Sequence, residues 1–306
     1  MKILITGSNG LLGNALKKIL GDGHVYHTRK DADLTNYEET YNYFKNKIVE
    51  DGVDTIIHAA ARVGGLSANI NNHQKFFKEN YLINNNVIKV CSTFKVENFV
   101  NILSTCIFPH ENITYPLTSE QIDVGPPHPS NYGYSYAKRL SGYETQIFRN
   151  ILQKNWYSVV PANLYGPHDN YNLEDSHLIG GMVHRAYLCK QNNEKFVVWG
   201  DGSPLRQFVH SEDLAKLILW SLTNWKSEKH CMMLDETEYS VLQIAKIICK
   251  KFGFSENDYV FDDTKPKGQF RKPAKSDVNH FEFRPIEAGI NDTIDWFIKN
   301  YENVRK

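Results

Sequence analysis

Short apolar runs alternate with amphipathic stretches along the first half of the chain. The runs at residues 2–6 and 53–61 predict buried strands, and the periodic apolar positions over 14–20 and 37–51 predict helices. The same pattern predicts further strands at 24–28, 98–103 and 157–162 and further helices at 76–94 and 134–155. Strands that alternate with helices in this way form a parallel sheet with helices on both faces. We therefore predict an α/β fold with a doubly wound parallel sheet.

The pattern changes character after residue 165. Residues 163–170 are rich in turn-forming side chains, and the polar, proline-broken segment 262–277 predicts a loop. The stretch between them predicts helices at 179–191, 212–223 and 240–253 and a strand at 196–199. We expect a first domain over 1–165 and a smaller C-terminal α/β lobe over 166–306, with some segments of the lobe returning to the first domain. Such a lobe would lie over the carboxyl edge of the sheet, where open α/β sheets bind ligands.

Composition and charge narrow the class of protein. The 35 basic and 35 acidic residues of the 306-residue chain cancel, so no overall field favours nucleic acid or an anionic membrane. No apolar run reaches the roughly 20 residues needed to span a bilayer, and the N-terminus lacks the pattern of a signal peptide. The cysteines show no CxxC spacing, which argues against a zinc site and a disulfide framework. They are Cys91, Cys106, Cys189, Cys231 and Cys249. We expect a soluble, cytoplasmic protein with no metal, nucleic acid or membrane partner.

Three glycines follow the first predicted strand and lead into the first predicted helix. Gly7, Gly10 and Gly13 suit a turn in which the backbone approaches a pyrophosphate, while the helix N-terminus supplies N–H donors and a partial positive charge. Leu11 and Leu12 belong to the same turn. The alternative is that the glycines only allow tight packing. Their position between a strand and a helix favours a Rossmann-type dinucleotide site.

The end of the second predicted strand bears on the choice of cofactor. In a Rossmann-type fold an acidic residue here selects NAD, whereas an arginine accommodates the 2′-phosphate of NADP. Arg29 and Lys30 favour NADP, although Asp31 and Asp33 would reverse that choice if the register differed by two residues. We predict NADPH as the cofactor, with Asp33 and Leu34 against the adenine.

Candidate catalytic residues follow this nucleotide turn along the chain. Ser104 follows the strand at 98–103, while Tyr134 and Lys138 lie four residues apart and therefore share a helix face. A nearby ammonium lowers the pKa of a phenol, which would make Tyr134 a proton donor near neutral pH, with Ser104 donating to the same substrate carbonyl. The Tyr–Lys spacing alone decides little, because it also occurs at Tyr26/Lys30, Tyr41/Lys45 and Tyr43/Lys47. The position of the pair behind a nucleotide turn favours the catalytic interpretation.

Several further motifs lie in order along the chain. They are 59–66 (AAARVGGL), 104–109 (STCIFP), 163–170 (NLYGPHDN), 175–177 (DSH) and 199–210 (WGDGSPLRQFVH). Together with the glycine turn and the Tyr–Lys pair, these motifs resemble the extended short-chain dehydrogenase/reductases that act on nucleotide sugars, and most of all the GDP-L-fucose synthase family. The resemblance covers nearly the whole chain.

The resemblance implies an enzyme that reduces a GDP-4-keto-6-deoxy sugar with NADPH and also epimerises it at C3 and C5. Ser104, Tyr134 and Lys138 are then the reductase residues, while Cys106 and His177 are the acid/base pair for epimerisation. Protons beside a 4-keto group are acidified because their removal gives an enolate, and a thiol and an imidazole both titrate near neutrality. Without the resemblance, Cys106 is read as a buried apolar residue and His177 as a capping or surface histidine.

The resemblance also implies binding residues and an assembly. Arg185 and Arg206 fall at the diphosphate of the GDP-sugar, which forked guanidinium groups suit. The other implied contacts are Trp199 and Lys275 to the substrate and Ala60, Lys138 and Asn163 to the cofactor. We further expect a homodimer, formed through paired long helices, and a role in GDP-sugar biosynthesis for surface polysaccharide.

The chain departs from the family pattern at a few positions. Thr105 and Phe108 replace a serine and a tyrosine, and Gly180 and Gly181 replace proline and alanine, which should loosen the helix that follows His177. These departures leave open whether the substrate sugar is a hexose or a heptose.

Other functions share the same fold. The sequence leaves open C4 reduction alone, on an already epimerised GDP-heptose, and a nucleotide-sugar 4-epimerase that recycles NAD. Ser104–Cys106 stands where a 4,6-dehydratase should have Thr-Asp-Glu, which argues against dehydration. A dinucleotide-binding module without catalysis is a further alternative, against which Tyr134 and Lys138 argue.

Overall fold

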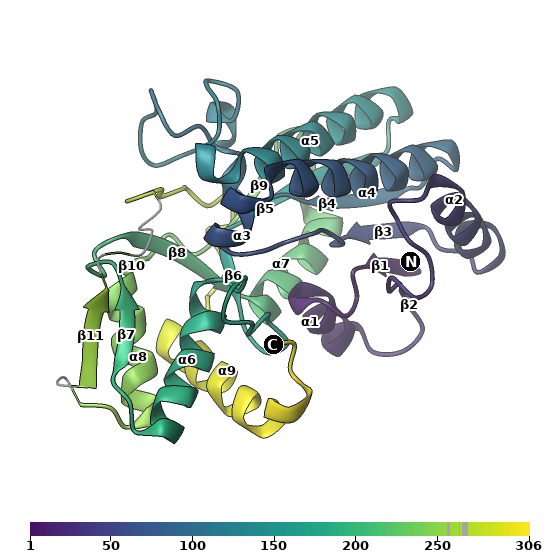
Figure 1. Cartoon of the computed structure of the whole chain (residues 1–306). Coiled ribbons are helices and arrows are strands. Elements are labelled where there is room, and N and C mark those ends of the chain that lie inside the picture. The colour runs from purple at the N-terminus through teal and green to yellow at the C-terminus, as the bar shows by residue number, and fades with distance from the viewer. Residues whose placement is uncertain (256–257, 263, 265–268) are drawn as a thin grey trace.

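A six-stranded parallel sheet forms the centre of the molecule in the computed structural model, which describes residues 1–255, 258–262, 264 and 269–306. Its strand order is β2-β1-β3-β4-β5-β9 (Figure 1). The strands are β1 (Ile3–Thr6), β2 (Val25–Tyr26), β3 (Thr55–His58), β4 (Asn98–Ile102), β5 (Asn155–Pro161) and β9 (Cys231–Met233). Because the order reverses beside β1, the carboxyl ends of β1 and β3 flank a crevice of the kind in which doubly wound sheets bind nucleotides.

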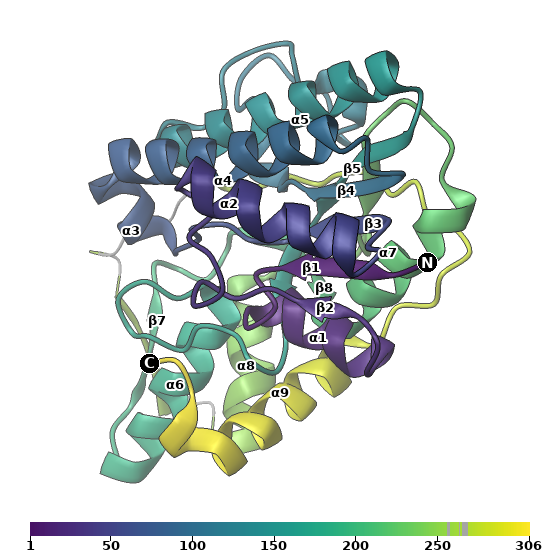
Figure 2. The same ribbon diagram turned by 90° about the vertical axis from the view of Figure 1, so that its right-hand side faces the viewer.

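Helices cover both faces of this sheet. Figures 1 and 2 show α2, α4 and α5 on one face and α1 and α7 on the other. These helices are α1 (Leu11–Leu20), α2 (Tyr37–Lys45), α4 (His73–Thr93), α5 (Tyr132–Leu152) and α7 (Ser211–Asn224). The two 21-residue helices α4 and α5 pack along each other, and α1 packs on α7. The predicted α/β fold with a doubly wound parallel sheet is confirmed.

A smaller lobe lies at one end of the sheet, at the lower left of Figure 1. It contains helices α6 (Leu178–Asn192), α8 (Val241–Phe252) and α9 (Ile286–Asn300). Its strands form a two-stranded sheet of β7 (Phe196–Trp199) and β11 (Tyr259–Asp262) and a three-stranded sheet of β6 (Asn163–Tyr165), β8 (Leu205–His210) and β10 (Glu238–Ser240). A separate aromatic core that includes Tyr171, Phe196 and Phe297 stabilises this lobe.

Short elements join these layers. They are α3 (Leu66–Asn71), a π-helix at Asn46–Glu50, and 3₁₀ turns at Thr105–Ile107, Ser119–Gln121, Pro129–Asn131 and Tyr301–Asn303. Among the described residues, no helix combines the length and apolar character that a membrane span requires.

Most predicted elements occur within a few residues of their expected bounds, but several elements were missed. Strands β6, β8, β9, β10 and β11 and helices α3 and α9 had no counterpart in the sequence prediction. A strand as short as Cys231–Met233 carries too few positions for a periodic pattern, and it exists because it pairs with Val159–Pro161 of β5. Residues from the second half of the chain therefore complete the sheet of the first half.

The predicted loop 262–277 lies partly outside the described residues, at positions 263 and 265–268. Of its described part, Asp262 ends β11, and Ala274 forms an isolated bridge with Leu117. That bridge holds the segment around Ala274 against the segment around Leu117 of the first domain.

Candidate active site

One cavity of about 1160 Å³ runs from the carboxyl ends of β1 and β3 into the smaller lobe. Pockets that bind one drug-sized ligand measure roughly 300–1,000 Å³, so this larger cavity has room for a cofactor together with a substrate. It is lined by all the predicted site residues except Lys275: Gly7, Gly10, Leu11, Leu12, Gly13, Arg29, Asp33, Leu34, Ala60, Ser104, Cys106, Tyr134, Lys138, Asn163, His177, Arg185, Trp199 and Arg206.

The glycine turn closes the cavity behind β1. Gly7 has a φ of +68°, and an added Cβ would lie 2.8 Å from Cα of Ala60. A Cβ on Gly13 would lie 2.7 Å from the carbonyl carbon of Ser8. Gly10 is the N-cap of α1, and its N–H donates to the Gly7 carbonyl at 2.9 Å. The backbone is therefore exposed to the cavity at the N-terminus of a helix, where a pyrophosphate fits.

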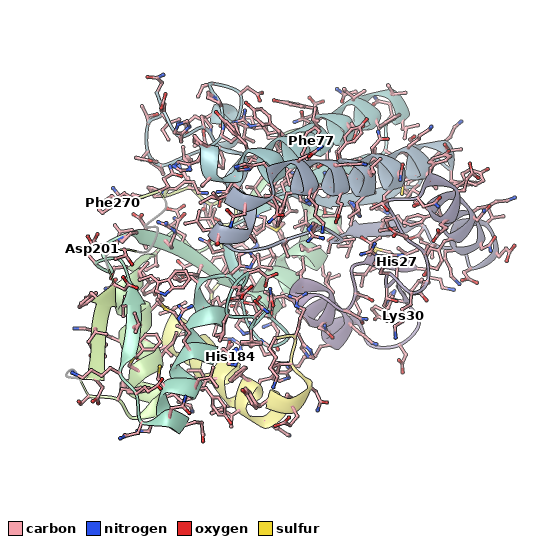
Figure 3. All side chains as sticks on the ribbon, in the orientation of Figure 1. His27, Lys30, Phe77, His184, Asp201 and Phe270 are labelled. Atoms are coloured by element: carbon pink, nitrogen blue, oxygen red, sulfur yellow. The ribbon has the colours of Figure 1, made fainter. Side chains whose placement is uncertain are left out.

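The segment after β2 lines the far end of the cavity, and Figure 3 shows His27 and Lys30 on it. Arg29 is 79% exposed, and its Nη2 pairs with Oδ2 of Asp33 at 2.9 Å. The hydrogen bond with Asp33 raises the pKa of the guanidinium, so Arg29 stays charged. Leu34 is buried beside it. An exposed, charged arginine at this place can bind a phosphate group.

The reductase candidates meet where β4 ends against the start of α5. The Ser104 hydroxyl accepts a hydrogen bond from the N–H of Cys106 at 3.2 Å and caps the turn Thr105–Ile107. Lys138 is buried, and its Nζ donates to the Ile102 carbonyl at 2.7 Å. Burial lowers the pKa of Lys138 to about 8. Tyr134 lies one helical turn before Lys138 and faces the same cavity.

The expected effect of Lys138 on Tyr134 is wrong. Burial raises the pKa of Tyr134 above its ordinary value, the neighbouring Cys106 thiol adds to this rise, and a hydrogen bond with Ser104 only partly opposes it. The Lys138 ammonium points instead to the Ile102 carbonyl. The phenol therefore stays protonated through the neutral range, which suits a proton donor.

The end of the cavity in the smaller lobe is cationic. The Arg185 guanidinium lies 4.7 Å from the centre of the Trp199 ring, and burial lowers its pKa to about 10. Nη1 of Arg206 donates to the Leu205 carbonyl at 2.7 Å. Burial lowers the pKa values of Arg206 and Lys272, and the Cys106 thiol opposes that shift in both. Both cations therefore lie close enough to Cys106 to act on it electrostatically.

Lys272, which the sequence prediction missed, lines the cavity where Lys275 was expected. Lys275 is exposed, and its N–H donates to the Leu117 carbonyl at 2.9 Å. The bridge between Leu117 and Ala274 fixes this register and leaves Lys272 facing the site. A lysine next to an arginine in an otherwise unremarkable loop was the only signal in the sequence.

Comparison with known proteins identifies the family. The sequence model of the NAD dependent epimerase/dehydratase family matches residues 3–233. The chain belongs to this family. It is 41% identical to the GDP-L-fucose synthase of Dictyostelium discoideum, over 99% of this chain and 97% of that protein. It is 39% identical to the probable GDP-L-fucose synthase of Drosophila melanogaster, over 100% of this chain and 99% of that protein.

A solved structure agrees with these relatives. A GDP-L-fucose synthetase from Naegleria fowleri, bound to NADP, superposes with a TM-score of 0.90 at 37% identity. The match covers 99% of this chain and 94% of that chain. The resemblance to the GDP-L-fucose synthase family is confirmed.

The two unusual glycines after His177 pack closely and do not loosen the helix. Helix α6 runs unbroken from Leu178 to Asn192. An added Cβ on Gly180 would lie 2.6 Å from the Asn170 carbonyl oxygen, and one on Gly181 would lie 3.3 Å from the Arg185 guanidinium. The expectation of a loosened helix is therefore wrong: Gly180 lies against the Asn170 backbone, which leaves no room for a side chain, and Gly181 packs against the side chains of Ser176 and Arg185.

The residues of the predicted epimerase pair line the same cavity from different elements. Cys106 lies on the turn after β4, and His177 is the exposed N-cap residue of α6. Asp169, which is buried and also lines the cavity, acts electrostatically with His177. The two acid/base candidates thus approach the cavity from the sheet and from the smaller lobe.

Proposed function

We propose that this protein is an NADPH-dependent 4-keto reductase of a GDP-4-keto-6-deoxy sugar that also epimerises the sugar at C3 and C5. The observation that carries the proposal is the continuous cavity, which joins the glycine turn, the Ser104–Tyr134–Lys138 group and a cationic end. The names of the relatives support the same activity.

The residues at the nucleotide end fit NADPH. The Gly7–Gly13 turn and the N-terminus of α1 would hold the pyrophosphate, and Arg29 with Lys30 would take the 2′-phosphate. Asp33 and Leu34 would border the adenine. Bound NADPH supplies the hydride for reduction. The NADP bound to the Naegleria relative supports this choice over NAD.

Reduction of the 4-keto group requires a proton at the sugar oxygen. Tyr134 donates it, because burial keeps the phenol protonated at neutral pH. Ser104 donates a hydrogen bond to the same oxygen and holds the carbonyl in place. The buried Lys138 donates to the Ile102 carbonyl, two residues before Ser104, and its pKa of about 8 leaves it largely protonated at pH 7.

Epimerisation requires proton transfer at the carbons on either side of the keto group. Cys106 and His177 are the proposed acid/base pair, and the Ser104–Tyr134 donors would stabilise the enolate. Arg206 and Lys272 lie close enough to Cys106 to interact with it electrostatically. The same site without inversion would give C4 reduction alone.

The cationic end is the proposed site of the GDP diphosphate. The guanidinium groups of Arg185 and Arg206 can each donate two hydrogen bonds to a phosphate, and the Lys272 ammonium adds a third positive charge. The Trp199 ring lines the same end of the cavity, with Arg185 against it. Lys272 replaces Lys275 in this role because only Lys272 reaches the cavity.

We also propose that two copies associate through helices α4 and α5. Their outer faces expose six large apolar side chains: Phe77, Tyr81, Tyr136, Leu140, Ile147 and Ile151. Figure 3 shows Phe77 on this side. A homodimer would bury this surface. Light scattering should then give the mass of a dimer for the wild type and a lower mass for Ile147→Asp.

Free cysteines throughout the chain support a cytoplasmic location.

The experiment is incubation of the protein with NADPH and GDP-4-keto-6-deoxymannose in heavy water, followed by NMR of the product. We expect NADPH oxidation together with deuterium at C3 and C5. Deuterium-free reduced product would reject epimerisation and leave C4 reduction. No NADPH oxidation on hexose or heptose substrates would reject the reductase. Tyr134→Phe, which removes the proton donor and keeps the ring, is the control for the reduction.

A further inference from the structure

Two adjacent cationic side chains of α5 donate hydrogen bonds to the two ends of the segment that carries Ser104 and Cys106. Nζ of Lys138 donates to the carbonyl of Ile102, the last residue of β4, at 2.7 Å. Nε of Arg139 donates to the carbonyl of Ile107, the last residue of the turn after β4, at 2.6 Å. The segment 102–107 is thus fixed to the same helix that carries Tyr134.

The turn itself has little intrinsic stability. Thr105–Ile107 is a single 3₁₀ turn, closed by Ile107 N–H to Ser104 O at 3.1 Å and Phe108 N–H to Thr105 O at 3.3 Å. One turn of helix is marginal without outside contacts, because nucleation fixes several dihedral angles for few hydrogen bonds. The charge-assisted bond from Arg139 is therefore a major restraint on its far end.

Arg139 is not itself part of the cavity. The side chain is buried with 8% exposure, and the residues described as lining the cavity do not include it. Its guanidinium lies 5.9 Å from the Tyr136 ring, and Tyr143 and Asp123 act on it electrostatically. Among the described residues, no hydrogen-bond partner faces its buried Nη2.

Burying a guanidinium with an unpartnered N–H lowers the stability of the folded state unless its other contacts compensate. Apolar side chains of similar volume pack more favourably than buried ions in many proteins. Its 2.6 Å bond to Ile107 is a direct contact between α5 and the backbone next to Cys106. That contact fixes the place of the thiol relative to the phenol, which an apolar side chain could not do.

We propose that Arg139 is a positioning residue for Cys106: it holds the turn so that the thiol reaches the sugar carbon while Tyr134 holds the keto oxygen. This role rests on the proposed function, in which Cys106 transfers the proton for epimerisation. Lys138 holds the Ser104 end and Arg139 the Cys106 end, so loss of Arg139 should impair epimerisation more than reduction.

The test compares Arg139→Met with Arg149→Met. Arg149 lies on the same helix and donates to the Trp156 and Lys226 carbonyls at 3.0 Å, away from the cavity, so its loss controls for general damage to α5. In heavy water we expect R139M to lower deuterium incorporation at least about tenfold, since misplacement by about 1 Å can cost up to 10²-fold. Reduction of a substrate already inverted at C3 and C5 should change by less than about threefold on the same reasoning. R139K, which keeps a donor, should recover part of the exchange.

A second measurement follows Cys106 directly and needs no turnover. Iodoacetamide labelling with peptide mass mapping gives the alkylation rate of Cys106, with Cys189, a partly exposed cysteine on α6, as the internal reference. We expect R139M, but not R149M, to change the Cys106 rate relative to Cys189 by at least about threefold, and R139K to change it in the same direction by a smaller factor, because thiol reactivity follows its local environment.

The two readouts separate the possible failures. Wild-type protein that does not exchange deuterium would reject the proposed epimerase, while the alkylation rates would still decide the position of Cys106. Equal alkylation rates in R139M and R149M, or equal losses of exchange and reduction in R139M, would overturn the positioning role. If R139M does not fold, R139K and its alkylation rate give the same decision.

Discussion

Gly133 links the packing of the two longest helices to Tyr134, the proposed proton donor. It lies in the first turn of α5, directly before Tyr134, and faces the backbone of His73 at the start of α4. An added Cβ would lie 2.8 Å from the His73 carbonyl carbon, 3.0 Å from its Cα and closer still to the carbonyl oxygen. Carbon atoms normally approach to about 3.5–4.0 Å, so Gly133→Ala must separate the two helices by roughly 1 Å.

Two effects set the size of the change in stability. Alanine is favoured over glycine inside a helix by about 1 kcal/mol, whereas overpacking costs about 1–3 kcal/mol. The contact atoms are backbone and cannot rotate away, so we expect the cost to exceed the gain and the free energy of unfolding to fall by about 1 kcal/mol. The shift also moves Tyr134, and a displacement of about 1 Å can lower kcat by up to 10²-fold.

The assay measures kcat for NADPH oxidation and the urea unfolding curve of Gly133→Ala beside those of Gly142→Ala. Gly142 lies on the same helix, but its added Cβ would meet side-chain atoms, Cδ1 of Leu103 at 3.2 Å and Cε1 of His230 at 3.3 Å, which can move aside. We expect this control to keep nearly full activity. Wild-type kcat in Gly133→Ala, or a larger loss in Gly142→Ala, would refute the link between this contact and the position of Tyr134.

Three further outcomes follow from the site. Burial holds the pKa of Lys138 at about 8, below its ordinary 10.5, so between these values the unfolded state binds more protons and stability rises with pH. Urea unfolding should therefore show the wild type gaining stability relative to Lys138→Met from about pH 8 to 10.5, and a constant difference across that range would contradict the shift. Arg29→Ala should lower the kcat/KM preference for NADPH over NADH by about tenfold, the loss of one charge-assisted bond, and an unchanged preference would remove Arg29 from the 2′-phosphate site. Lys272→Met should raise the KM for the GDP-sugar by about tenfold on the same grounds, whereas the exposed Lys275→Met should not; equal effects of the two substitutions would contradict the assignment of Lys272 to the diphosphate.

The sequence by itself determined the main architecture and much of the site. The apolar runs and the helical periodicity are local patterns, so they located the core strands and the long helices without knowledge of their partners. The Gly7–Gly13 turn is also local, because its glycines are needed within one strand–turn–helix unit. The positions of Ser104 at a strand end and of Tyr134 before Lys138 on one helix followed in the same way.

Only the tertiary structure decided what depends on contacts between distant segments. The bridge from Leu117 to Ala274 turned Lys272, and not Lys275, toward the cavity. The direction of Lys138 toward Ile102, and the burial that raises the pKa of Tyr134, arise from packing between β4 and α5. The role proposed for Arg139 depends on the same interface. Such contacts join residues that lie 32 to 157 positions apart, so no periodic pattern within one element encodes them.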